Sequence, residues 1–203
     1  MLFGKLENGE NIYKYLLTNG QCEIEIITYG GIITNIKVPD KNNNMLDIAL
    51  GFDTLEQYLE GHPYFGAIVG RYANRIDNGK FTINNTDYNL AVNNNGTSLH
   101  GGLKGFDKVN WNVLSYDLEN KRFLKLNYLS EDMEEGYPGN LNVNVTYTLS
   151  DDNELSVEYS ADTDKTTVLN LTQHSYFNLS GESSGDILNL SLIHISEPTR
   201  RDQ

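Results

Sequence analysis

A strict alternation of apolar and polar residues constrains the fold of this chain more than any other feature. The longest alternating run is Leu141–Leu149, and shorter ones cover Cys22–Ile26 and Leu155–Ser160. Successive side chains of an extended strand point to opposite faces, so each run presents one apolar row to a core and one polar row to water. The pattern predicts antiparallel strands, each with one buried face.

Turn-forming residues separate these runs and set the strand lengths. They are Asn19-Gly20, Asp77–Gly79, Asn84-Asn85 and Asp151–Asn153. The segments Lys80–Ile83 and Tyr88–Leu90 flank one of these turns and form a predicted hairpin. Helical patterning is scarce: Thr54–Leu59 is one short candidate helix, with Asp53 or Thr54 as its cap. Closely spaced strands with few helices predict an all-β antiparallel sandwich in one domain.

Composition excludes some classes of partner. The 203 residues suffice for one domain, and 15 Lys and Arg against 28 Asp and Glu give a net charge of −13. This charge argues against nucleic acid or an anionic membrane surface as partner. Cys22 is the single cysteine, so no internal disulfide forms. With no secretory signal and no apolar run near the roughly 18 residues of a membrane span, we expect a cytoplasmic protein.

Two histidines are the first candidates for chemistry. His100 and His174 lie among Gly, Asn, Ser and aromatic residues rather than in charged stretches. Imidazole titrates nearest neutrality of all side chains, so such a pair is suited to proton transfer. The alternative is that both are hydrogen-bonded core or turn residues.

The segments around these histidines resemble the galactose mutarotase (aldose 1-epimerase) family. The sequence similarity extends over most of the chain, up to about Asn189. The resemblance rests on Tyr29–Thr34, Leu50–Thr54, Pro63–Ile76, Asn95–Gly102, Gly105–Lys108, Glu135–Gly139 and Gln173–Leu179. It implies a large antiparallel β-sandwich with a sugar cleft across one sheet. It also implies interconversion of the α and β anomers of aldohexoses such as galactose and glucose.

The resemblance assigns roles to five residues. His174 matches the acid that protonates the ring oxygen, and His100 matches a second histidine that binds and polarises that oxygen. Asn74 and Arg75 match a sugar-contacting pair, and Tyr176 matches a pocket residue beside the acid. Ring opening needs only proton transfers, so no metal or organic cofactor is expected. The expected partner is a small aldose sugar, and the oligomeric state stays open.

For other residues in these motifs, a functional and a structural interpretation are both open. Arg71 is a candidate sugar contact or an ion-pairing arginine, and Tyr176 is a pocket residue or sheet core. Trp111 stacks on a sugar or lies in a strand core, with the core favoured. Gly101 and Gly102 are expected to permit a tight turn rather than touch a ligand. Nothing in the sequence makes Asp107 or Glu135 the catalytic base.

The end of the chain departs from the resemblance. Residues 190–203 do not resemble the family's continuation and look like a translated sequencing adapter. We therefore expect residues 1–189 to be the N-terminal part of a single mutarotase domain and 190–203 to be non-native. The family's base, a glutamate, and a sugar-holding aspartate have no counterpart here. The sequence thus predicts an incomplete sandwich, inactive by itself, from an active parent protein.

Two alternative functions stay open at this stage. One is a non-catalytic sugar-binding β-sandwich, which a continuation without the glutamate would favour. The other is a related epimerase for phosphorylated sugars, which would require a basic phosphate cradle. The sequence contains no such basic cluster.

Overall fold

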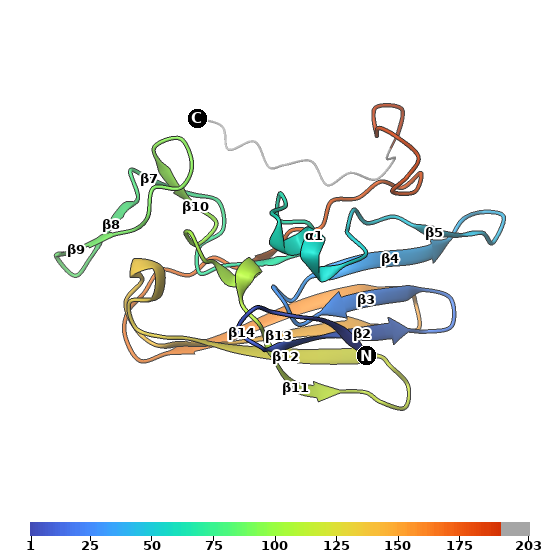
Figure 1. Ribbon diagram of the computed structural model, residues 1–203, viewed down its shortest axis with the longest axis horizontal. Coiled ribbons are helices and arrows are strands. Elements are labelled where there is room, and N and C mark those ends of the chain that lie inside the picture. Colours follow the sequence, from blue (N-terminus) through green and yellow to red (C-terminus); the bar gives the residue numbers. More distant parts are fainter. Residues whose placement is uncertain (192–203) are drawn as a thin grey trace.

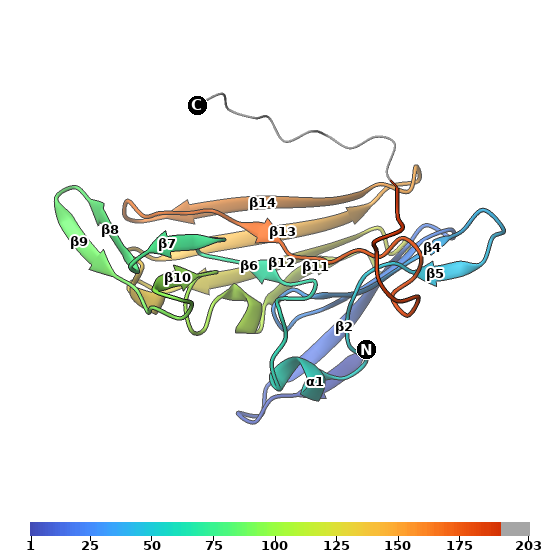
Figure 2. The same cartoon turned by 90° about the horizontal axis from the view of Figure 1, so that it is seen from above.

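The computed structural model describes residues 1–191 and contains two main antiparallel sheets with a shared core (Figures 1 and 2). The first sheet joins consecutive strands in the order β1-β2-β3-β4-β5. Its strands are β1 (Leu2–Lys5), β2 (Asn11–Thr18), β3 (Glu23–Ile27), β4 (Ile33–Pro39) and β5 (Met45–Asp47). The alternation predicted at Cys22–Ile26 falls mainly in β3, where Ile24 and Ile26 are buried and Glu23 is exposed.

The second sheet has the order β11-β12-β13-β14, again with neighbours in chain order. Its strands are β11 (Asn112–Tyr116), β12 (Phe123–Ser130), β13 (Leu141–Leu149) and β14 (Leu155–Thr163). In β13 every second residue from Leu141 to Leu149 is buried and the residues between are half-buried, so the predicted alternation is confirmed. Within residues 1–191, β14 pairs only with β13 and forms an edge of the sheet.

The core lies where the two sheets meet. Leu17, Ile24 and Ile26 of the first sheet belong to the same buried cluster as Leu126 and Val143 of the second. Burial of such a continuous apolar face is the main favourable term in folding. One hydrogen bond also crosses the core: the Tyr147 hydroxyl donates to the Gly31 carbonyl at 2.7 Å. The prediction of an all-β antiparallel sandwich is confirmed.

Three short strand pairs complete the fold. They are β6 (Ile68–Val69) with β15 (Thr172–Gln173), β7 (Arg75–Asp77) with β10 (Thr97–Leu99), and β8 (Lys80–Ile83) with β9 (Thr86–Asn89). The last pair is the predicted hairpin, whose second strand begins two residues earlier than expected. The β7–β10 and β8–β9 pairs project at one end of the sandwich, and the chain after β14 runs back along it (Figure 2).

Within residues 1–191, helices are few and short, as predicted. They are α1 (Leu55–Leu59) and the 3₁₀ turns η1 (Phe106–Lys108) and η2 (Glu134–Gly136). Thr54, rather than Asp53, caps α1: its side chain accepts from the Gln57 N–H, and the Gln57 side chain accepts from the Thr54 N–H. No helix in the described part of the chain is long and apolar enough to cross a membrane.

The predicted boundary after residue 189 lies almost at the end of the described part. Residues 192–203, which form most of the segment 190–203, lie outside the described residues. The non-native origin of that segment, and the treatment of 1–189 as part of one domain, therefore stay predictions.

Candidate active site

His100 and His174 lie against each other, although one follows β10 and the other follows β15. Their ring centroids are 5.1 Å apart and the ring planes are nearly perpendicular, at 87°. Both side chains are half-buried. The structure therefore brings the two candidate histidines together, and their proximity allows both rings to meet one small ligand.

The pairing of β7 with β10 places Asn74 opposite His100. Arg75 pairs with Leu99 in this register, so the preceding and following residues face each other. His100 N–H donates to the Asn74 carbonyl at 3.0 Å, and Asn74 N–H donates to His100 Nδ1 at 2.9 Å. Because Nδ1 accepts, the proton of the neutral ring is on Nε2, which is free to donate to a ligand.

The surroundings of His100 keep its imidazole neutral. Burial, together with the charges of His174, Arg75 and Lys108, lowers the pKa of His100 to about 4. At neutral pH the His100 ring therefore has one donor, Nε2–H, and one acceptor, Nδ1, which Asn74 already occupies.

The backbone around His174 is held on both sides. Strand β15 pairs with β6, and beyond this pair His174 N–H donates to the Ala67 carbonyl at 2.9 Å. The Gln173 side chain donates to the Gly66 carbonyl at 2.8 Å and accepts from the Ser175 N–H at 2.8 Å. These contacts give the histidine a fixed position relative to the first sheet.

Tyr64 was missed by the sequence reasoning as a site residue. Its ring lies 4.5 Å from that of His100 and 5.6 Å from that of His174. The Tyr64 ring therefore packs against both imidazoles. Lys108 Nζ lies 5.4 Å from the Tyr64 ring centroid and 2.5 Å from Asp107 Oδ2. Tyr64 has a left-handed backbone, with φ +64, and a single sequence contains no signal that predicts this conformation for an aromatic residue.

His62 is a third histidine of this aromatic cluster, also missed. Its ring makes edge contacts with Tyr58 at 5.3 Å and Tyr64 at 6.5 Å. Burial, with the charges of Lys108 and His174, lowers the pKa of His62 to about 4. At neutral pH the uncharged ring therefore packs against these two tyrosines.

Both histidines line an open groove of about 590 Å³, within the range of about 300–1,000 Å³ usual for ligand clefts. Its lining is mostly polar: Ala73, Asn74, His100 and residues 170–175. Within residues 1–191, no carboxylate and no Lys or Arg lines it. No group of three His, Cys, Asp or Glu in that part of the chain could hold a metal ion.

The other expected sugar contacts lie close to this groove. Arg75 is exposed, and its Nη1 donates to Asn74 Oδ1 at 3.2 Å, which places it beside a groove residue. Tyr176 is 39% exposed, with its ring 5.1 Å from His174 and 5.2 Å from Phe65. Tyr176 is thus next to His174 rather than in the sheet core.

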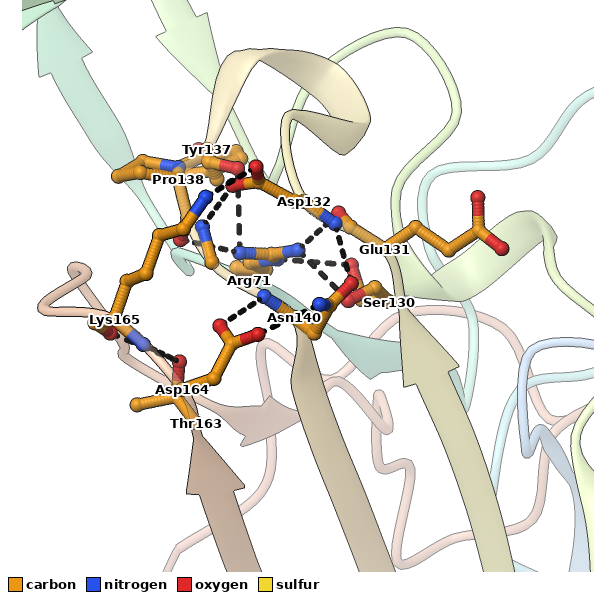
Figure 3. Close-up of polar contacts among 11 residues, drawn as sticks. Arg71, Ser130, Glu131, Asp132, Tyr137, Pro138, Asn140, Thr163, Asp164 and Lys165 are labelled. Carbon is orange, nitrogen blue, oxygen red and sulfur yellow. Dashed lines mark hydrogen bonds and ion pairs between the residues drawn. The ribbon is translucent and has the colours of Figure 1, made fainter.

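Arg71 is not a sugar contact. It is 2% exposed, and its guanidinium donates to four backbone carbonyls and one hydroxyl (Figure 3). The acceptors are the Ser130, Glu131, Tyr137 and Pro138 carbonyls and Ser130 Oγ. A guanidinium with this many fixed partners is a structural anchor. Trp111 is likewise core, since it is 2% exposed and its Nε1–H donates to the Phe106 carbonyl.

Neither of the two carboxylates left open by the sequence faces the groove. Asp107 is buried and paired with Lys108, and burial raises the pKa of its carboxyl. Glu135 accepts from the Leu103 and Lys104 N–H groups. The expected turn role of Gly101 and Gly102 is confirmed: both have positive φ, and a side chain at Gly101 would overlap the Gly70 carbonyl.

Fold and site together define an antiparallel β-sandwich protein with two facing histidines in an open polar groove. The family model for aldose 1-epimerase matches residues 13–199. This chain belongs to the aldose 1-epimerase family.

Proteins with similar sequences are named galactose mutarotase or aldose 1-epimerase. Galactose mutarotase of Sus scrofa is 49% identical over 189 residues, which cover 92% of this chain and 53% of the relative. Aldose 1-epimerase of Escherichia coli (strain K12) is 35% identical over 177 residues, covering 87% and 50%. The chain spans about half the length of the curated relatives that it matches.

Solved structures agree with this fold. An aldose epimerase homologue from C. elegans superposes with a TM-score of 0.80 at 30% identity, covering 84% of this chain and 52% of that one. Galactose 1-epimerase from Lactobacillus acidophilus NCFM gives a TM-score of 0.75 at 26% identity, with 88% and 52% covered.

Proposed function

We propose that the parent protein interconverts the α and β anomers of an aldohexose such as galactose or glucose, by acid–base opening of the sugar ring. The observation that carries this proposal is the contact between His100 and His174 at one open polar groove. Membership of the aldose 1-epimerase family supports the same reaction.

In this proposal the two histidines have different roles at the ring oxygen of the sugar. His174 donates the proton that opens the ring. His100 stays neutral and donates Nε2–H to the same oxygen, because its Nδ1 is already occupied by Asn74 N–H. A neutral His100 also avoids a second positive charge beside a protonated His174, at a ring separation of 5.1 Å.

Asn74, Arg75 and Tyr176 are the proposed sugar-binding residues. The Asn74 amide lines the groove, and the Arg75 guanidinium is hydrogen-bonded to it. Such groups offer directional hydrogen bonds to hydroxyls. The Tyr176 ring beside His174 offers an apolar surface to one face of the sugar.

The reaction also requires a base for the C1 hydroxyl. Within residues 1–191 the groove has no carboxylate in its lining, so these residues supply only the acid and the polarising group. We therefore propose that the base is a carboxylate of the parent protein, and we expect the 203-residue chain to leave anomer exchange at its spontaneous rate.

Polarimetry on freshly dissolved α-galactose tests this proposal. We expect the product of the full reading frame at the source locus to accelerate mutarotation, and His174→Gln to slow it about 10²- to 10⁴-fold, the usual contribution of one positioned acid. Glu131→Gln, whose side chain is exposed and outside the groove lining, is the control for the substitution itself. Equal rates for wild type and His174→Gln would contradict the proposed role of His174.

Sugar binding without any rate increase by the full product would indicate a non-catalytic sugar-binding protein. Among the described groove residues no Lys or Arg is present to hold a phosphate group, so a phosphorylated sugar is not the proposed substrate. The cytoplasm remains the proposed location, supported by the free and buried Cys22.

A further inference from the structure

The turn that carries His100 has an unfavourable backbone. His100, Gly101 and Gly102 have φ values of +54, +92 and +117, and only the two glycines adopt such angles at little cost. A histidine in the left-handed region persists only where its surroundings hold it there. The position of the His100 ring therefore depends on whatever fixes residues 99–104.

Two side chains fix this turn from outside it. Asn93 Nδ2 donates to the Leu99 and Gly102 carbonyls at 3.0 and 2.8 Å, and Asn93 Oδ1 accepts from Leu99 N–H at 2.7 Å. Glu135 Oε2 accepts from Leu103 N–H at 2.7 Å, and its Oε1 accepts from Lys104 N–H at 3.0 Å. Hydrogen bonds to a charged acceptor are the stronger kind.

Glu135 lies directly against Gly102, whose φ of +117 also favours glycine. A Cβ at Gly102 would collide with Glu135 Oε2. Glu135 itself has φ +49, and it lies in η2 within the loop 130–140 between β12 and β13. The carboxylate is thus placed by its loop and not by an exposed, freely rotating side chain.

The loop 130–140 is in turn anchored by Arg71, whose guanidinium lies at its centre (Figure 3). Arg71 donates to carbonyls on both sides of η2, among them those of Glu131 at 2.7 Å and Pro138 at 3.0 Å. On its outer side the loop is tied to the turn after β14, where the Asn140 side chain donates to Asp164 Oδ2 at 2.7 Å.

These contacts form a continuous series that begins at Arg71 and returns to the same segment at Asn74. Arg71 stands three residues before Asn74 in the chain and holds the loop that presents Glu135. Glu135 holds the turn that presents His100. His100 Nδ1 accepts from Asn74 N–H, which completes the series.

We propose that Glu135 is a positioning residue, which through Leu103 and Lys104 holds His100 in its left-handed conformation with Nδ1 on Asn74 and Nε2–H available to a ligand. The value of that orientation for a sugar rests on the proposed function. The orientation itself does not, so it can be tested without any sugar.

The test is NMR of the imidazole nitrogens of the full 203-residue chain as a function of pH. In the wild type we expect the His100 ring to show the Nε2–H tautomer and to titrate near 4. In Glu135→Ala we expect a mixture of tautomers and a midpoint shifted toward the ordinary 6.5. The groups that face the ring, His174, Tyr64, Arg75 and Lys108, are unchanged in that variant.

If Glu135→Ala does not fold, the His100 tautomer and midpoint are measured in Glu135→Gln instead. Because the Gln amide retains one acceptor oxygen, we expect an intermediate shift in that variant. Glu131→Gln is the matched control, since the Glu131 side chain is exposed on the same loop and makes no hydrogen bond within the described residues. Amide exchange at Leu103 and Lys104 should accelerate about 10- to 100-fold in Glu135→Ala only.

An unchanged His100 tautomer and midpoint in the Glu135 variants would overturn the proposal, even with faster exchange at Leu103 and Lys104. Equal shifts at His62, His100 and His174 would also overturn it, because they would report a general loosening of the fold.

Discussion

At the scale of single residues, two arginines four positions apart in the chain have opposite environments. Arg71 is buried with all its acceptors inside the protein, whereas Arg75 is exposed beside the groove. The sequence alone does not distinguish them, because both stand in one short polar segment. The loop 130–140 surrounds the Arg71 guanidinium (Figure 3), whereas the Arg75 guanidinium donates to Asn74 and Asn94.

Replacing each arginine by methionine should separate these roles. Arg71→Met leaves several buried acceptors without donors, at about 1–3 kcal/mol each, so we expect a loss of about 3 kcal/mol or more in the free energy of unfolding. Arg75→Met should change it by no more than about 0.5 kcal/mol. Urea denaturation of both variants measures this, and similar losses for the two would contradict the assignment of Arg71 as the anchor.

The depressed pKa values of His62 and His100 predict how stability depends on pH. Both rings have a folded pKa of about 4, below the 6.5 expected when unfolded. Between these values the unfolded chain binds more protons, so the free energy of unfolding is highest above pH 6.5 and falls as pH approaches 4. His62→Phe removes one of the two groups and should reduce the loss measured by urea denaturation between pH 7 and pH 5. An unchanged pH dependence would show that His62 titrates normally.

At the scale of elements, α1 shows what local sequence determines and what it leaves open. The run Thr54–Leu59 predicted a short helix, because caps and helix formers act within a few residues. Two adjacent residues were equally suitable as the cap, and the reciprocal bonds between Thr54 and Gln57 select Thr54. Leu55 and Tyr58 of this helix are buried in the core next to the first sheet.

Substitution at the two candidate caps tests this selection. Thr54→Ala should lower the free energy of unfolding by about 1 kcal/mol, the usual cost of a lost N-cap. Asp53→Ala should change it by no more than about 0.5 kcal/mol, because the Asp53 side chain makes no capping bond. A larger loss in Asp53→Ala than in Thr54→Ala, measured by thermal or urea denaturation, would reverse the assignment.

At the scale of the whole molecule, the strands were more predictable than the site. Alternation in β13 and the Asn-Asn turn of the β8–β9 hairpin are local signals, and both were correct. Tyr64, His62 and the role of Glu135 were missed, since each depends on segments distant in sequence and on left-handed backbone at Tyr64 and Glu135. His100 and His174 were singled out by their surroundings in the sequence, a family resemblance assigned their roles, and the structure shows their contact.

The central claim is that a sugar binds in the groove lined by His100 and His174, and its most direct test is a galactose titration of the 203-residue chain followed by NMR. We expect saturable shifts of the imidazole resonances of His100 and His174 and of the Asn74 amide, with His62 unaffected as the internal reference. Arg75→Met should weaken binding about tenfold, the loss of one good hydrogen bond to a charged group. Saturable binding that leaves both imidazoles unchanged, or shifts only residues far from the groove, would contradict the claim.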